Sequence, residues 1–131
     1  MGRVTLDSSI LISIFYEGDV HFETVRNIMN GKDNSYFIST ISLAETLTHA
    51  SRKGSMPVKL MVGRINEAMT QIYDVNQEIA VAASMVRAKT GLKMPDAIIS
   101  ATATLARSQL WTLDQRLARA HKGAILIGGE K

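Results

Sequence analysis

The chain has 131 residues, of which 46% are hydrophobic and 21% charged, a composition typical of a folded globular protein and unlike that of a disordered one. It contains no cysteine, which excludes disulfides and thiolate metal sites, and no apolar run near the roughly 20 residues that a membrane helix needs. Fifteen basic and twelve acidic residues give a net charge of +3, which mildly favours a polyanionic partner. We therefore expect one cytoplasmic domain over residues 1–131.

The first half of the chain alternates short β-rich segments with amphipathic ones. Residues 3–6 predict a strand that ends at Asp7-Ser8-Ser9, a helix-start signal before the apolar residues 10–15. The pattern then predicts a helix over 20–30, a strand over 36–39 and a helix over 41–52. Pro57 suits the first position of a further helix, whose apolar stripe runs to Ile72.

The second half continues the alternation. The pattern predicts a strand over 72–75, a helix over 77–90 that stops at Gly91, and a helix over 97–107 that is rich in Ala, Ser and Thr. A strand over 109–112, a short helix over 114–121 and a strand over 124–127 follow. Parallel strands need crossover connections, which are usually helical, so five strands separated by helices predict a mostly parallel sheet in a three-layer α/β/α fold.

Four acidic residues occupy the predicted starts of helices or lie close to them. Asp7 and Asp114 directly follow strands, Glu45 lies one to two turns into the helix after the second strand, and Asp96 lies in the first turn of the small-residue helix. Each has an ordinary structural use, as an N-cap, as part of a capping box with Ser42, as a solvated residue or as a charge at a helix N-terminus. Together they point to the carboxyl edge of a parallel sheet, where such folds bind ligands.

A cluster of carboxylates has a direct chemical consequence. Without a cation the charges repel one another and their pKa values rise, whereas a hard divalent cation removes the conflict. Oxygen ligands suit Mg²⁺ or Mn²⁺, and neither ion needs the cysteine that the chain lacks. Because such ions activate water and stabilise charge on phosphorus oxygens, the cluster favours phosphoryl chemistry.

At these residues the chain resembles the PIN-domain nucleases, and among them the VapC-type toxins of toxin-antitoxin pairs. The resemblance spans nearly the whole length and rests on four acidic motifs in order, of which none is specific alone. The motifs are Thr5-Leu6-Asp7-Ser8-Ser9-Ile10-Leu11-Ile12, Ser42-Leu43-Ala44-Glu45, Pro95-Asp96-Ala97-Ile98-Ile99-Ser100-Ala101-Thr102-Ala103 and Thr112-Leu113-Asp114.

The resemblance implies a PIN-like fold and a function. Asp7, Glu45, Asp96 and Asp114 are implied to bind one or two Mg²⁺ or Mn²⁺ ions that activate water for hydrolysis of RNA. Thr112 is implied as a supporting hydroxyl, and Ser8 as a group that orients Asp7. A homodimer and a cognate antitoxin that covers or inserts into the acidic cleft are implied as well.

Two other kinds of residue bear on this interpretation. The histidines at 21, 49 and 121 are widely separated and show no metal-ligand spacing. Basic residues, each by itself an ordinary solvated side chain, could together hold an RNA backbone electrostatically. They form three groups: Arg52, Lys53, Lys59 and Arg64; Arg87, Lys89 and Lys93; and Arg107, Arg116, Arg119 and Lys122.

Three alternatives to a toxin ribonuclease are open at this stage. The chain could be a PIN-domain RNA-processing enzyme outside any toxin-antitoxin pair, or a PIN-like module that grips RNA or a protein without cutting it. The presence of all four acids weighs against the module. A receiver-type phosphoacceptor domain would show paired acids near the first strand and a lysine after the last, and neither pattern occurs.

Overall fold

The computed structural model of the chain describes residues 2–30, 33–53 and 57–128. Within these ranges five strands form one sheet in the order β3-β2-β1-β4-β5, and every neighbouring pair is parallel. The strands are β1 (Gly2–Leu6), β2 (Asn34–Ser39), β3 (Gln71–Tyr73), β4 (Gln109–Thr112) and β5 (Ile125–Leu126). The expected parallel sheet is thereby confirmed.

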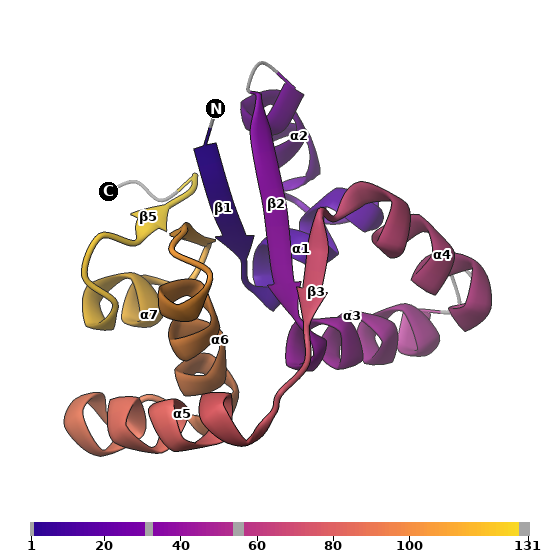
Figure 1. Cartoon of the computed structure of the whole chain (residues 1–131). Helices are drawn as coiled ribbons and strands as arrows, with labels where there is room; N and C mark the ends of the chain where they lie inside the picture. Colours follow the sequence, from indigo (N-terminus) through magenta and orange to yellow (C-terminus); the bar gives the residue numbers. More distant parts are fainter. Residues whose placement is uncertain (1, 31–32, 54–56, 129–131) are drawn as a thin grey trace.

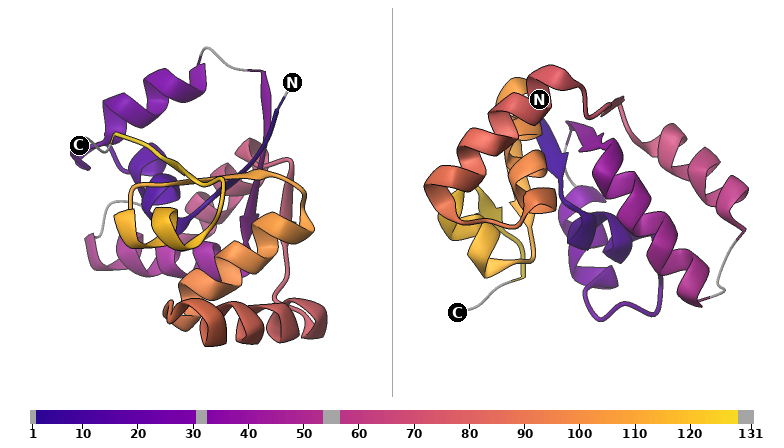
Figure 2. Two further views of the ribbon diagram at one scale, coloured as in Figure 1. Left: turned by 90° about the vertical axis from the view of Figure 1, so that its left-hand side faces the viewer. Right: turned by 90° about the horizontal axis from the view of Figure 1, so that it is seen from below.

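Helical layers cover both faces of the sheet (Figure 1). The helices in the described ranges are α1 (Ser8–Phe15), α2 (Phe22–Asn30), α3 (Thr40–Lys53), α4 (Val58–Ala68), α5 (Gln77–Thr90), α6 (Met94–Leu105) and α7 (Gln115–Ala120). Figure 2 shows α1, α3 and α4 gathered to one side of β1 and α5 to α7 to the other. The fold is the expected three-layer α/β/α arrangement, and none of its described helices has both the length and the apolar character needed to span a bilayer.

The hydrophobic core divides into two clusters, one on each face of the sheet. Successive side chains of a strand point to opposite faces, so in β4 Leu110 joins the cluster of α5, α6 and α7, whereas Trp111 joins that of α1 to α4. Trp111 is buried and meets the ring of Tyr36 edge-on at 6.0 Å. The sequence leaves open whether Met56, Met61 and Met69 form a self-association face or part of the core. Met61 and Met69 are 2% and 7% exposed and belong to the core, whereas Met56 lies outside the described residues.

Several element boundaries differ from the sequence prediction. Pro57 is the N-cap of α4 rather than its first residue, and α4 ends at Ala68. The backbone N–H of Thr70 already donates to the carbonyl of Tyr36 in β2, at 2.7 Å. Strand β3 follows over Gln71–Tyr73, so it begins before Ile72 and ends before Val75. The last strand contains only two residues instead of four.

The capping box that would have involved Glu45 does not form, because α3 begins earlier than expected. The helix starts at Thr40, and the hydroxyl of Ser39 caps it by accepting the backbone N–H of Ile41 at 3.1 Å. Ser42 therefore lies inside the helix, where its Oγ is buried and has no hydrogen-bond partner in the described part of the chain. Glu45 has no capping role, and its side chain is available for other contacts.

Two left-handed residues close the helices on the α5–α6 side. Gly91 ends α5 with φ of 75°, a conformation that glycine adopts at little cost. Arg107 follows α6 with φ of 53°, and the bonds Arg107 N–H to Thr104 O and Ser108 N–H to Ala103 O form a Schellman motif. Glycine is the usual residue at that position, so an arginine there is mildly strained.

Candidate active site

The strand order places two of the acids at the switch point of the sheet, where the chain stops adding strands on one side of β1 and begins to add them on the other. From β1 the chain proceeds to β2 and β3 on one side, and later to β4 and β5 on the other. Asp7 immediately follows β1, and Asp114 lies two residues after the end of the adjacent β4. Open parallel sheets bind ligands outside the carboxyl ends of their strands at such a switch point.

Asp7 is the most enclosed of the four acids, with 4% of its surface exposed. It is the N-cap of α1: its Oδ1 accepts the N–H of Ile10 at 3.0 Å and the hydroxyl of Ser9 at 2.6 Å. Its Oδ2 accepts the hydroxyl of Thr112. Burial raises the pKa of Asp7, whereas these three hydrogen bonds act to lower it and the charge of Asp114 adds to the rise.

Thr112 and Ser9 connect Asp7 to the loop that follows β4. Thr112 Oγ1 donates to Asp7 and accepts the N–H of Asp114 at 2.9 Å, while Ser9 Oγ donates to Asp7 and accepts the N–H of Leu113 at 3.1 Å. The two hydroxyls therefore fix the ends of β1 and β4 relative to each other. A carboxylate accepts about four hydrogen bonds, so Asp7 retains acceptor capacity after these three.

Glu45 is held at the same edge by a different serine. Ser8 Oγ donates a hydrogen bond to Glu45 Oε1, which draws a side chain of α3 toward the start of α1. The resemblance assigned Ser8 to Asp7, and that assignment is wrong. Ser8 is the first residue of α1 and reaches sideways to α3, whereas Ser9 folds back onto the N-cap.

Asp96 is half-buried in the first turn of α6, where Lys93 is the N-cap and makes no side-chain cap bond. Burial raises its pKa, and the charges of Asp114, Asp7 and Glu45 raise it further, in that order, whereas Lys93 lowers it. Asp96 thus lies within electrostatic reach of all three other acids. A carboxyl group with these neighbours is stabilised by any cation that enters between them.

Asp114 forms the exposed border of the acidic group. It is the N-cap of α7, and its Oδ1 accepts the N–H of Arg116 at 2.8 Å. Both Asp7 and Asp114 therefore have the capping role that the sequence suggested, and both also contribute charge to Asp96. Capping and a place in the acidic group are compatible, because a cap uses only part of a carboxylate's acceptor capacity.

The acidic group is not a closed cage for an ion. Among the described residues no three His, Asp or Glu side chains are arranged to bind one metal ion together. This donor set nonetheless suits Mg²⁺ or Mn²⁺, since Mg²⁺ is usually held by one or two carboxylates together with water and substrate phosphates. Burial raises the pKa values of Asp7 and Asp96, and the charges of neighbouring acids add to both rises.

Ser9 is the site residue that the sequence reasoning missed. It lies within the first acidic motif, two residues after Asp7, and a serine at the second position of a helix capped by an aspartate is well placed to bond that aspartate. This local signal was present in the sequence. The second bond of Ser9, to Leu113 N–H across 104 residues, could be seen only in the folded chain.

The family model of the PIN domain matches residues 4–123. The chain belongs to the PIN-domain family. No curated protein is similar enough in sequence to count as a match. Solved structures, in contrast, do match this PIN domain.

Three solved structures illustrate the likeness of this PIN domain to VapC-type toxins. A toxin-antitoxin complex from Klebsiella pneumoniae contains a similar chain at 25% identity and a TM-score of 0.77, over 93% of this chain and 95% of that one. The sarcin-ricin loop cleaving toxin VapC20 of Mycobacterium tuberculosis gives a TM-score of 0.80 at 16% identity, over 95% and 98%. DNA-bound VapBC from Salmonella typhimurium gives 0.66 at 17%, over 95% and 96%.

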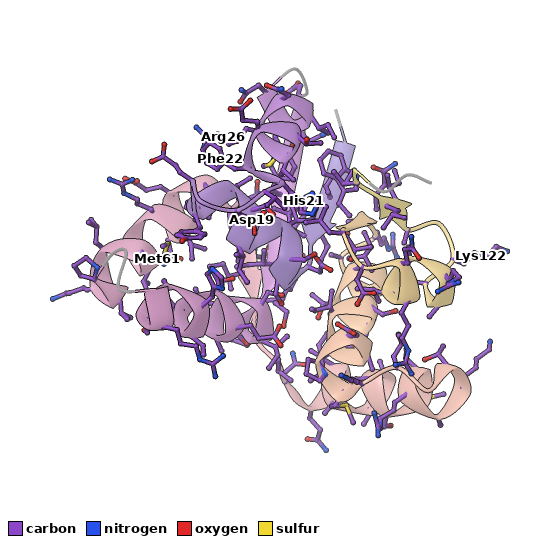
Figure 3. All side chains as sticks on the ribbon, turned by 180° about the vertical axis from the view of Figure 1, so that it is seen from behind. Asp19, His21, Phe22, Arg26, Met61 and Lys122 are labelled. Atoms are coloured by element: carbon purple, nitrogen blue, oxygen red, sulfur yellow. The ribbon has the colours of Figure 1, made fainter. Side chains whose placement is uncertain are left out.

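Two surface hollows of the PIN domain lie near α1. One, of about 380 Å³, lies where α1, α2 and α4 meet and contains none of the four acids. It includes Phe22 and Arg26 of α2 (Figure 3), and the guanidinium of Arg26 lies 5.3 Å from the ring centre of Phe22. Arg64 of α4 also lines it. The other, of about 350 Å³, lies between α1 and α3 and includes Glu45.

Proposed function

We propose that this PIN domain is a metal-dependent endoribonuclease and the toxin of a toxin-antitoxin pair. The observation that carries the proposal is the position of Asp96 in the first turn of α6, where burial raises its pKa and the charges of Asp114, Asp7 and Glu45 raise it further. Asp96 thus lies within electrostatic reach of carboxylates from three other segments of the chain, beside the switch point of a parallel sheet. Such a group favours the entry of cations and of a phosphate-bearing substrate that shares them.

We infer that Asp7 and Asp96 are the main ligands of Mg²⁺ or Mn²⁺, with Asp114 and Glu45 completing one or two sites. When bound there, the ion supplies Lewis acidity, which activates water for attack on phosphorus and offsets the charge of the leaving oxygen. The chain's own groups supply position: Ser9 and Thr112 orient Asp7, and Ser8 orients Glu45. Groups that orient a metal ligand in this way affect activity nearly as strongly as the ligand itself.

RNA is the proposed substrate, either single-stranded or structured. The net charge of +3 supports it, because an ion at the acids would leave the remaining surface more basic still. The VapC20 toxin, which cleaves the sarcin-ricin loop, shares the fold. We place the protein in the cytoplasm, where such RNA is found.

An antitoxin is the proposed protein partner, as in the Klebsiella pneumoniae complex. The hollow between α1, α2 and α4 supports this, since Arg26, Arg64 and Phe22 there offer charge and aromatic surface next to one acid, Glu17. A homodimer is proposed as well. Its support is the apolar side chains that α5 exposes, with Met85 67% and Val81 56% exposed.

The decisive experiment is cleavage of labelled single-stranded RNA by the purified protein with Mg²⁺, with Mn²⁺ and with EDTA. We expect cleavage with either ion, none with EDTA, and none with Asp7→Asn or Asp96→Asn, both of which should retain wild-type circular dichroism. Wild-type activity in either variant would overturn the mechanism. RNA binding by the wild type without any cleavage would favour a non-cleaving PIN-like module.

The toxin role needs a separate test. Induced expression in a bacterial host should arrest growth, and Asp96→Asn should not. Growth should resume when the product of an adjacent upstream reading frame is expressed together with the toxin. A nuclease that is active in the tube, harmless in the cell and without such a neighbour would instead be an RNA-processing enzyme.

A further inference from the structure

The hollow between α1 and α3 extends away from the acidic group along one face of α3. Besides Ile12 of α1 it is lined by Glu45, Thr48, His49 and Arg52. Helix positions three, four and seven residues apart lie on the same side, so these α3 side chains form one row. The row leads from an acid of the candidate active site to a cation.

Arg52 is the charged group at the far end of this row. It is exposed and, among the described residues, forms no hydrogen bond or ion pair. Thr48 uses its hydroxyl within α3, donating to the carbonyl of Ala44 at 2.9 Å. Seven residues at a rise of 1.5 Å place Arg52 about 10 Å along the helix from Glu45. A guanidinium at that position can pair with a phosphate through two parallel hydrogen bonds.

The floor of the hollow is partly apolar and has an unused polar atom. Ile12 lies on one side, and the ring of His49 meets the ring of Tyr16 edge-on at 5.2 Å. Nε2 of His49 is buried and, within the described part of the chain, has no hydrogen-bond partner. Aliphatic and aromatic surface beside a cation is the combination on which single-stranded nucleic acids lie. The volume of about 350 Å³ falls in the usual range of ligand sites.

We propose that this hollow binds the RNA strand next to the scissile phosphodiester, with Arg52 pairing a flanking phosphate. The inference rests on the proposed ribonuclease activity and adds a direction to it: the strand leaves the acids along α3 rather than toward α7. The hollow supports this direction, because it leads from Glu45 to Arg52. The acids repel a flanking phosphate that has no cation of its own, and Arg52 supplies one.

The first test measures affinity in the Asp96→Asn background, with a labelled single-stranded RNA that the wild type cleaves. The variants are Arg52→Ala, Arg52→Glu and, as a matched control, Arg107→Gly. Arg107 lies before β4, at the amino end of the sheet and opposite the acids, so the structure separates it from Arg116 and Arg119, with which the sequence grouped it. The control removes one positive charge there, and glycine suits the left-handed backbone. We expect Arg52→Ala to weaken binding about five-fold at 0.1 M salt and to reduce the salt slope by about 0.7. Arg107→Gly should match the parent protein.

The second test locates the phosphate. Oligonucleotides of the same sequence carry 2′-O-methyl groups and one neutral methylphosphonate, placed at each position in turn. One substitution next to the cleavage site should weaken binding by the parent and not by Arg52→Ala. If no position shows this coupling, or if Arg52→Glu binds as tightly as Arg107→Gly, the inference is wrong although the wild type cuts the RNA. A wild type that neither binds nor cuts RNA would overturn the proposed function itself.

Discussion

Thr112 donates a hydrogen bond from Oγ1 to Oδ2 of Asp7, a residue 105 positions earlier in the chain. The same hydroxyl accepts the backbone N–H of Asp114 at 2.9 Å. One hydroxyl oxygen is therefore hydrogen-bonded both to the carboxylate of Asp7 and to the backbone of Asp114. Because β1 and β4 are adjacent in the sheet, this bond spans the switch point and holds its two sides in a fixed relation.

The first prediction concerns this hydroxyl. Thr112→Val keeps the shape of the side chain but leaves Asp7 and the Asp114 N–H without their partner. We expect RNA cleavage to fall about 10- to 100-fold, and the free energy of unfolding to fall by about 1–3 kcal/mol. Thr112→Ser, which keeps the hydroxyl, should retain most activity. Initial cleavage rates and urea unfolding measure both effects, and full activity in the valine variant would show that Thr112 has no positioning role.

A second prediction concerns the electrostatic cost of the acids. Because burial and its neighbours raise the pKa of Asp96, its contribution to stability is present below the unfolded pKa near 3.8 and is lost as pH rises through the folded value. The upward shift of the pKa means that burial and the repulsion of the other acids together outweigh the favourable helix N-terminus. In EDTA at pH 7, Asp96→Asn should therefore be more stable than wild type, by an amount on the order of 1 kcal/mol or less.

The matched control for this prediction is Asp33→Asn, an exposed acid before β2 at the opposite end of the sheet, which should change little. Added Mg²⁺ should raise the melting temperature of wild type and of Asp33→Asn, because a ligand that binds only the folded state stabilises it. Asp96→Asn should lose most of this gain. A variant that is less stable than wild type in EDTA would contradict the electrostatic interpretation.

The third prediction is a pH dependence unconnected with the acids. His121 caps the C-terminus of α7, and its Nδ1 lies 2.6 Å from Ser100 Oγ in α6. Burial lowers its pKa, so the stability it contributes is present above the unfolded pKa near 6.5 and is lost as pH falls through the folded value. The unfolding free energy of wild type relative to His121→Asn should therefore decrease as pH is lowered from 7 to 5.

The difference between variants is needed in that experiment, since Asp7 and Asp96 change stability in the opposite direction over the acidic range. Urea unfolding at half-unit pH steps provides the measurement. Parallel curves for wild type and His121→Asn would show that protonation of His121 is not linked to folding.

The fourth prediction addresses self-association. If α5 provides the dimer contact, Met85→Glu places a charge in it and should yield monomers, with an unchanged circular dichroism spectrum because Met85 is 67% exposed. Val20→Glu, at a position that is 89% exposed between α1 and α2, should remain dimeric. Sedimentation equilibrium distinguishes the two outcomes. Dimeric Met85→Glu would move the interface elsewhere, and a monomeric wild type would contradict the dimer.

The sequence predicts the layers and the sheet of this fold well, since strands and helices alternate with clear periodicity. It fails at short boundaries: α3 begins at Thr40 because Ser39 supplies the cap, and β3 ends at Tyr73 because its pairing with β2 ends there. Asp7, Asp96 and Asp114 were recognisable as helix-start residues, and Glu45 as an acid one to two turns into a helix. Their mutual influence was not, because electrostatic coupling between Asp96 and Asp7 depends on a distance that no local pattern contains.

The hydroxyls around the acids show the same limit. Local spacing could have suggested Ser9 as a partner of Asp7, as a residue near the start of a helix that Asp7 caps. Local spacing could not have shown that Ser8 bonds Glu45 rather than Asp7, because the partner of Ser8 depends on where α3 lies. Arg52 is similar: it belongs to a basic stretch in the sequence, and only the hollow beside Glu45 distinguishes it from its neighbours.

Helix α6 has a mechanical consequence for the nuclease site. It packs against α5 and α3 and against strands β1, β2 and β4. Most of its buried side chains are small, among them those of Ala97, Ala101 and Ala103. Ala97, the residue after Asp96, is fully buried, so a larger side chain at this position would displace the first turn of α6. Such a displacement would move Asp96 relative to the other carboxylates without altering any of them. The spacing of the four acids therefore depends on how the core beneath α6 is packed.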